Sequence, residues 1–303
     1  MTRDEEFLLF PEAFKRRYSN TQEDAHETLN HILDALDAEA RVGLPSSNSG
    51  FDGPLNDLRL LTPVEQLFCG TLRNEIQCTI CSTLLINYER FRELNLGIKT
   101  QDCTRRICLE DLLDDYFGSE VLNSFHCKKC KKSIQVVRTS RVLRAPNLLI
   151  IQLKRFNSFG AKISIPVNFN VMYVLFMMQF FVLSLAVSCH LTALVRLNMG
   201  RYVHNVKELH LYDLSGVIQH LGNSADYGHY NAVVRSFDGR SFYLLDDEQR
   251  HRISLNDLHN TQAYILVYIR CNAFKSPEVS RSNVNDAQNG TPPKNRTVKR
   301  VSS

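Results

Sequence analysis

Apolar residues in the first part of the chain follow a helical spacing. Between residues 22 and 40 they recur every three or four positions, which places them on one face of a helix. The members of this face are Ala25, Leu29, Ile32, Leu33 and Leu36. Thr21 with Asp24, or Asn20 with Glu23, has the spacing of an N-terminal capping box. The pattern therefore predicts one long amphipathic helix near the start of the sequence.

Later in the chain, short aliphatic and aromatic runs predict strands. Residues 135–139 and 148–153 have this character, and the second run is apolar almost throughout. Residues 230–234 and 241–245 flank the turn signal Phe237-Asp-Gly-Arg240, which predicts a hairpin. Further predicted elements are a buried strand at 264–268, an amphipathic helix at 109–117 and a helix or turn at 254–258. Helices and strands in this order indicate an α+β fold.

The predicted hairpin brings a histidine and a carboxylate together. His229 opens its first strand and Asp246 closes its second, so the two side chains lie at the same end. A carboxylate beside an imidazole fixes its tautomer and stabilises the imidazolium, as in acyl-transfer triads. On spacing alone, a surface hairpin that merely contains a histidine is an equal alternative.

Four cysteines form two knuckles. Cys78 with Cys81, and Cys127 with Cys130, have two-residue spacing, which lets both sulfurs of a pair reach one tetrahedral ion. Together they predict a closed structural Zn²⁺ site. Lysines around the second knuckle, at 128, 129, 131 and 132, leave a nucleic-acid-binding zinc ribbon as a less favoured alternative.

Composition and charge limit the classes of partner and the cellular compartments that the sequence predicts. The chain has 303 residues and a net charge of +4, and much of that charge lies in the polar stretch after Phe274. Bulk charge therefore does not favour a nucleic-acid partner. The nine cysteines are odd in number and no signal peptide is recognised, which favours a reducing compartment, the cytoplasm or nucleus.

One segment does not fit a globular pattern. Residues 163–195 carry no charged side chain, and the apolar stretch at 171–195 exceeds the roughly 20 residues that span a bilayer. A single span would put its flanking strands on opposite sides of a membrane, so membrane association is disfavoured. A buried element, an interfacial insert or sequence from a retained intron remain as alternatives.

Several motifs in this order resemble the ubiquitin-specific proteases, papain-like cysteine peptidases that remove ubiquitin. The histidine box consists of Tyr212-x-Leu-x-Gly-Val-Ile-x-His220, Gly228-His229-Tyr230 and Asp246-Asp247. Residues 22–27, the two knuckles, residues 153–156 and residues 263–268 supply the other marks. The resemblance covers about residues 15–270.

The resemblance implies a thumb, palm and fingers architecture with zinc-ribbon-like fingers. The implied ranges are 1–40 for the remnant of the helical thumb, 41–62 for a flexible linker, 63–170 for fingers and palm with the zinc site, 171–204 for the apolar insert, 205–271 for the palm with the histidine box, and 272–303 for a disordered tail.

The resemblance also assigns roles to residues. His229 would act as general base and then acid, and Asp246 would orient it, with Asp247 beside them. The implied contacts to ubiquitin are Gln22, Asp24, His220 and Tyr230. Lys154 and Arg155 either solubilise a strand end or contact ubiquitin. Ubiquitin and ubiquitinated proteins are the expected partners.

The nucleophile is the element that the motifs do not supply. The family carries its cysteine in a Gly-Asn-Thr-Cys-like box well before the segment that corresponds to Gln22, and residues 1–21 contain no cysteine. Cys69 is the first cysteine, and it lies in a different setting. We therefore expect this chain to be an inactive fragment of a deubiquitinase. A catalytically inactive ubiquitin-binding scaffold is the alternative from another class, and a membrane-anchored adaptor is a weaker one.

Overall fold

The computed structural model describes residues 23–42, 61–99, 107–169, 171–172, 194–205 and 210–271. All of them belong to one compact unit, Met1–Ala273. The helices of this part are α3 (Ala25–Arg41), α4 (Pro63–Phe68), α5 (Leu109–Tyr116), the 3-10 turn η4 (Gly200–Tyr202) and α6 (Leu255–His259). The strands are β1 (Gly70–Cys78), β2 (Leu84–Phe91), β3 (Glu93–Gly97), β4 (Ile107–Cys108), β5 (Glu120–His126), β6 (Ser133–Arg144), β7 (Leu148–Lys154), β8 (Val167–Asn168), β9 (Val171–Met172), β10 (Leu194–Asn198), β11 (Leu211–Leu221), β12 (His229–Arg235), β13 (Phe242–Asp246), β14 (Gln249–Ile253) and β15 (Ala263–Arg270).

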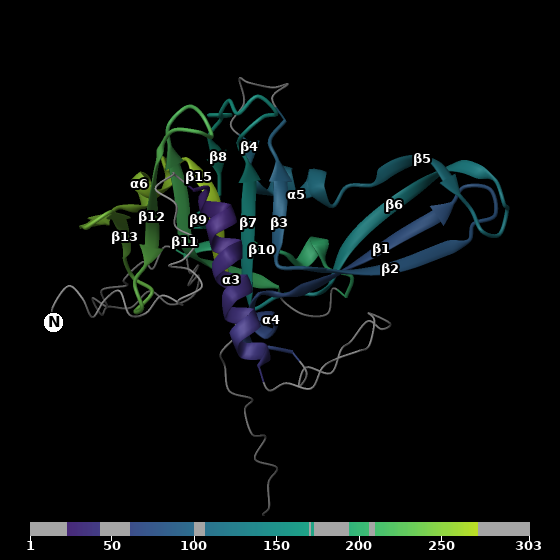
Figure 1. The fold of residues 1–303 in the computed structure, drawn as a ribbon, viewed down its shortest axis with the longest axis horizontal. Coiled ribbons are helices and arrows are strands. Elements are labelled where there is room, and N and C mark those ends of the chain that lie inside the picture. The colour runs from purple at the N-terminus through teal and green to yellow at the C-terminus, as the bar shows by residue number, and fades with distance from the viewer. Residues whose placement is uncertain are drawn as a thin grey trace, which may run out of the picture. The chain divides into compact units, whose positions relative to one another are not determined.

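The larger sheet, which we call the palm sheet, has the strand order β14-β13-β12-β11-β15-β7-β3 (Figure 1). Strand β10 pairs with β11 at one side of this path and with β9. Its pairings are antiparallel except for β3 with β7, which run parallel. The central strands β7 and β15 are apolar on both faces, as expected for strands that are covered on both sides. The predicted strands at 148–153 and 264–268 are confirmed.

Helix α3 covers part of the palm sheet (Figure 1). Leu33 packs against Ile150 of β7 and Ile265 of β15 in one hydrophobic cluster. The helix is as predicted, but its N-cap is Asp24 itself, whose side chain accepts from the backbone N–H groups of His26 and Glu27. Both predicted capping boxes, which would make Thr21 or Asn20 the N-cap, were therefore wrong as to which residue caps the helix.

Helix α4 begins at a closed capping box. Thr62 accepts from the Glu65 backbone N–H, and the Glu65 carboxylate accepts from the Thr62 backbone N–H. Thr62 is fully buried and donates its hydroxyl hydrogen to Asp37 of α3. Residues 43–60 of the predicted linker lie outside the described residues. Residues 61 and 62 are part of the packed fold, so the predicted linker boundary extended too far.

The smaller sheet, which we call the fingers sheet, consists of four antiparallel strands in the order β2-β1-β6-β5 (Figure 1). Strand β6 is longer than the predicted strand at 135–139, because it continues to Arg144 at the base of the sheet. The knuckle Cys78–Cys81 lies between β1 and β2, and the knuckle Cys127–Cys130 lies between β5 and β6. The two knuckles therefore meet at one end of this sheet.

The predicted apolar insert has a structured end. Val195 and Leu197 are buried in the main core, and β10 pairs with β11 through residues 196–198. The palm sheet thus includes residues that the sequence pattern had placed in the insert. Residues 173–193 lie outside the described residues, as do 272–303. No helix in the part of the chain that the structure describes is long and apolar enough to cross a membrane.

Candidate functional site

The hairpin of β12 and β13 places the predicted histidine and carboxylate together. His229 is the first residue of β12 and Asp246 the last of β13, and the strands pair antiparallel through residues 232–235 and 242–245. The His229 Nε2 atom lies 2.5 Å from Asp246 Oδ1. This geometry follows from the turn at 236–241, whose hydrogen bonds fix the register of the hairpin.

The pair is electrostatically matched. The hydrogen bond to Asp246 raises the pKa of His229 above its ordinary value, and the same bond lowers the pKa of Asp246. Asn231 also faces the Asp246 carboxylate, at 3.5 Å. Because Nε2 is engaged by the carboxylate, Nδ1 is the nitrogen left for proton transfer to a reacting group. The His229 side chain is 42% exposed, so a substrate can reach it.

Asp247 lies in the turn that follows. Its backbone has a φ of +50°, in the left-handed region that Asp adopts more readily than most residues. Side-chain ligand atoms of His229, Asp246 and Asp247 lie within 4.8 Å of one another. Asp247 therefore adds negative charge beside the imidazole, although Asp246 makes the hydrogen bond.

Asp24 links the helix to the palm sheet. Its Oδ2 atom accepts hydrogen bonds from the hydroxyls of Tyr230, at 3.0 Å, and Tyr264, at 2.8 Å. Its Oδ1 atom caps α3. Burial and the nearby Asp24 charge raise the pKa of both tyrosines, so both remain neutral donors. Asp24 thus caps α3 and also holds Tyr230, the residue next to His229.

His220 is buried beneath the same strand. Its ring is fully inaccessible and packs edge-on against Phe156 and Tyr230. Burial lowers its pKa, so the ring is neutral at neutral pH. The ring has no exposed surface, and the contact of His220 with ubiquitin that the resemblance implies stays a prediction. Gln22 lies outside the described residues, and Tyr230 is half-buried.

Arg155 is also placed differently from its prediction. It is fully buried, and its guanidinium donates to the carbonyl oxygens of Ala263, Ile163 and Ile165. Burial lowers its pKa to about 10, so it remains charged at neutral pH. Arg155 neither solubilises the strand end nor offers a surface to a partner, whereas Lys154 is exposed. No motif-level signal distinguishes the two neighbours.

The two knuckles have the same backbone geometry. Cys78 accepts at its carbonyl from Ser82 N–H, and Cys127 accepts likewise from Lys131 N–H. Ser82 and Lys131 both have a φ of +53°. In each knuckle the second cysteine's N–H points to the first cysteine's sulfur, at 3.4 and 3.5 Å. This repeat turns all four sulfurs toward one point.

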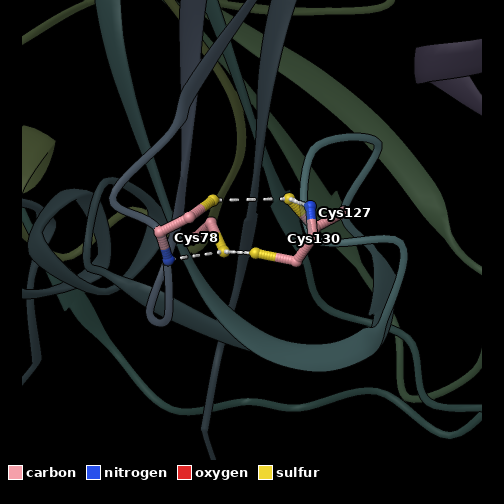
Figure 2. A group of neighbouring side chains, drawn as sticks. Cys78, Cys127 and Cys130 are labelled. Atoms are coloured by element: carbon pink, nitrogen blue, oxygen red, sulfur yellow. Dashed lines mark hydrogen bonds between the residues drawn. The ribbon is translucent and has the colours of Figure 1, made fainter.

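The sulfur positions fit a tetrahedral ion (Figure 2). Cys78 Sγ lies 3.8 Å from Cys130 Sγ, and Cys81 Sγ lies 3.8 Å from Cys127 Sγ. A tetrahedron with metal–sulfur bonds of about 2.3 Å has edges of about 3.8 Å. A hydrogen bond from Thr83 lowers the pKa of Cys81 to about 6, while the adjacent Cys81 sulfur raises that of Cys130. The cluster could therefore bind a metal ion.

Cys69 does not have the properties of a nucleophile. It is 6% exposed and caps the end of α4. Burial raises the pKa of its thiol, which disfavours the reactive thiolate. In the described part of the chain, the hydrogen bond recorded for the His229 ring goes to Asp246, not to a cysteine.

Comparison with known families decides the class. A profile described as "Ubiquitin carboxyl-terminal hydrolase" matches residues 5–268. The chain belongs to the ubiquitin carboxyl-terminal hydrolase family. The membership predicted from the motifs is confirmed by this match. The family consists of cysteine peptidases.

Curated relatives of this hydrolase chain are longer. It is 31% identical over 281 residues to ubiquitin carboxyl-terminal hydrolase 36 of Drosophila ananassae, covering 90% of the chain and 22% of the relative. It is 29% identical over 270 residues to the protein of that name from Drosophila melanogaster, covering 86% of the chain and 23% of the relative. The chain thus spans less than a quarter of the length of these relatives.

Solved structures share the fold of the hydrolase chain. The Ubp8-Sgf11-Sgf73-Sus1 SAGA DUB module matches with a TM-score of 0.64 at 21% identity, over 89% of this chain and 53% of that one. The SAGA Ubp8/Sgf11/Sus1/Sgf73 DUB module bound to ubiquitin aldehyde matches with a TM-score of 0.62 at 23% identity, over 82% and 50%. The predicted α+β fold of the ubiquitin-specific protease type is confirmed.

Proposed function

We propose that this chain is the palm and fingers part of a deubiquitinase, which hydrolyses the bond between the C-terminal glycine of ubiquitin and an amine of its target. The observation that carries the proposal is the His229–Asp246 pair, with Nε2 held by the carboxylate and Nδ1 left open. Membership in the hydrolase family supports it. We assign the role of nucleophile to none of the cysteines that the structure describes.

In the proposed reaction, His229 moves a proton twice. Its Nδ1 atom takes the thiol proton, and the thiolate attacks the glycine carbonyl carbon. The imidazolium then gives that proton to the leaving amine as the C–N bond breaks, which leaves an acyl-thioester. Finally His229 takes a proton from water as the water oxygen attacks the thioester. The imidazolium returns this proton to the departing sulfur, which restores the thiol, and the carboxyl group of ubiquitin is released and ionises.

The other elements would position ubiquitin. We propose that Asp24, Tyr230 and Tyr264 support the ubiquitin tail, because their shared hydrogen bonds fix the helix beside His229. We further propose that Cys78, Cys81, Cys127 and Cys130 hold a structural Zn²⁺ as four thiolates, since the sulfur spacing matches that ion. Reduced cysteines of this kind agree with a cytoplasmic or nuclear location.

The first test is binding of unmodified ubiquitin to the 303-residue chain by isothermal titration calorimetry. We expect binding that weakens several-fold in Tyr230→Phe, with Lys99→Gln, an exposed side chain after the end of β3, as the control. Absence of binding, with the fold intact by circular dichroism, would overturn the proposal.

The second test separates an enzyme from an inactive module. The protein that carries this sequence in cells is incubated with ubiquitin bearing a cysteine-reactive C-terminus, and the adduct is mapped by mass spectrometry. Labelling at a single cysteine supports the deubiquitinase. The alternative is a ubiquitin-binding scaffold, which the burial of Cys69 favours. Ubiquitin binding without any labelling would select the scaffold.

A further inference from the structure

Strand β14 forms an edge of the palm sheet. Its one neighbour among the described strands is β13, and the two pair without a recorded register shift over residues 249–253. Its sequence, Gln-Arg-His-Arg-Ile, contains no proline. An edge strand presents unpaired backbone N–H and C=O groups to a further strand. The backbone of β14 can therefore accept an additional strand.

Two of the four exposed side chains of β14 are guanidinium groups. Gln249, Arg250, His251 and Arg252 are all exposed. Arg250 lies 4.0 Å above the Tyr243 ring. The pKa of Asp238 is lowered first by its hydrogen bond from Ser236 and also by the charge of Arg252. The two arginines are separated by one residue, so they lie on the same face of the strand. The edge thus carries two guanidinium charges on one face.

The position of β14 relative to the His229–Asp246 pair indicates which part of a substrate would lie beside this edge. Gln249 pairs in register with Asp246, the residue that holds His229. Tyr230 follows His229 on β12 and Tyr264 lies on β15, so in the sheet order β14-β13-β12-β11-β15 neither tyrosine lies between the His229–Asp246 pair and β14. If ubiquitin's tail follows Asp24 and these tyrosines, the departing amine and its protein lie toward β13 and β14.

We propose that β14 binds an extended acidic segment of the ubiquitinated protein, which adds to the palm sheet as a further strand beside the modified lysine. The proposal rests on the deubiquitinase function proposed above. Carboxylates at alternate positions of the segment would lie opposite Arg250 and Arg252. Asp247 and Glu248, in the turn before β14, repel acidic side chains there and attract a cationic one, which sets the register.

The test uses peptides of about nine residues that alternate glutamate with threonine and carry a fluorophore. Binding to the 303-residue chain is measured by fluorescence anisotropy at low ionic strength. The comparison peptides replace glutamate by glutamine, replace glutamate by lysine, or replace the threonines by proline. The protein variants are Arg250→Glu with Arg252→Glu, and the control Lys99→Glu with Arg201→Glu, which reverses two exposed charges outside β14 and outside the four-cysteine cluster.

We expect the glutamate peptide to bind and its affinity to fall roughly tenfold in the β14 variant and not in the control. The β14 variant should instead bind the lysine peptide, which shows that the variant is folded. The proline peptide should bind weakly, because proline cannot donate to a strand ladder. Equal binding of the glutamine or proline peptide would overturn the proposal.

Two further measurements keep the conclusion specific. A short oligothymidine that binds more tightly than the glutamate peptide, and loses binding in the β14 variant, would assign the edge to nucleic acid and overturn the proposal. Unmodified ubiquitin should bind the β14 variant as it binds the unchanged chain. If the peptide binds as expected but ubiquitin does not, the deubiquitinase function fails while strand addition to β14 stands.

Discussion

The palm sheet and the fingers sheet are both largely antiparallel, yet they are stabilised in different ways. In the palm, Ile151, Leu153 and Leu266 are fully buried between layers. In the fingers, Leu84 and Leu85 are each 46% exposed and Val121 is 53% exposed. Burying an apolar side chain contributes about 1.5–3 kcal/mol, so the palm gains far more from burial than the fingers.

The difference indicates what the four cysteines are for. A sheet that is accessible on both faces cannot hold its distal end by packing alone. A metal ion bound by the four sulfurs would supply a cross-link between β1–β2 and β5–β6 at the end where burial is least. The palm needs no such device, because α3, α4 and α5 cover its strands.

The largest expected effect is that of removing the Zn²⁺ that we propose for the four cysteines of the fingers. Structural zinc contributes on the order of 10 kcal/mol in small zinc domains. Chelation, or Cys78→Ser with Cys127→Ser, should therefore raise amide hydrogen exchange in the distal parts of β1, β2, β5 and β6 and leave β7 and β15 protected. Cys271→Ser, a thiol outside the cluster, is the control. Unchanged exchange after verified metal removal would contradict this account.

A core truncation in the palm should have the next largest effect. Leu153→Ala removes a fully buried side chain from β7 and should lower the free energy of unfolding by about 2–5 kcal/mol. Ile86→Ala in β2 removes a side chain that is 37% exposed and should cost less than about 1 kcal/mol. Urea denaturation followed by circular dichroism measures both. Similar costs at the two positions would remove the distinction between the sheets.

Asp24 offers a smaller, more local test of how the palm holds its helix. Asp24→Ala removes the N-cap of α3 and leaves the Tyr230 and Tyr264 hydroxyls without their acceptor, so it should destabilise by about 2 kcal/mol. Asp24→Asn keeps the capping oxygen and should cost less. The readout is the thermal midpoint. Equal shifts in the two variants would mean that the cap contributes nothing.

The smallest effect concerns protonation of the His229–Asp246 pair. The His229 pKa is raised above 6.5 and the Asp246 pKa lies below 3.8, both first because of their mutual hydrogen bond. The His229 part of this stabilisation is complete below pH 6.5 and is lost as pH rises through the raised pKa. The Asp246 part is complete above pH 3.8 and is lost as pH falls through the lowered pKa. The pair is therefore strongest in the mildly acidic range between them.

Nuclear magnetic resonance of the His229 ring measures this titration. Asp246→Asn should return the His229 pKa toward 6.5, because the carboxylate no longer stabilises the imidazolium. Asp238→Asn, in the turn at the other end of the hairpin, is the matched control and should leave the titration unchanged. An unaltered His229 pKa in Asp246→Asn would show that the two groups do not interact in solution.

Local patterns were sufficient to predict the hairpin and the knuckles. A two-residue period with a turn signal determines which ends of two strands meet, and this placed His229 beside Asp246. The spacing of each cysteine pair restricts its backbone to a tight turn, and the fold then brings the two turns together. In both cases the residues that determine the geometry are close in sequence.

Residues whose environment depends on distant partners could not be predicted in this way. Helical spacing placed Leu36 on the buried face of α3, but Leu36 is 41% exposed while Asp37 is buried. Asp37 is tolerated there because Thr62 and Arg41 satisfy its carboxylate, which also keeps its pKa low. Arg155 is a similar case, since its acceptors come from the 163–165 loop and β15.

Gly228 and His220 also limit how this sequence can diverge. A Cβ atom at position 228 would lie 2.0 Å from His220 Nε2, closer than real atoms approach, and His220 is enclosed by Phe156 and Tyr230. The same Cβ atom would lie 2.7 Å from the Leu221 carbonyl oxygen, a backbone atom that no substitution makes smaller. Position 228 is thus restricted to glycine even where His220 is replaced by a smaller residue. A substitution scan should therefore reject every side chain at position 228, also in a background in which position 220 has been changed.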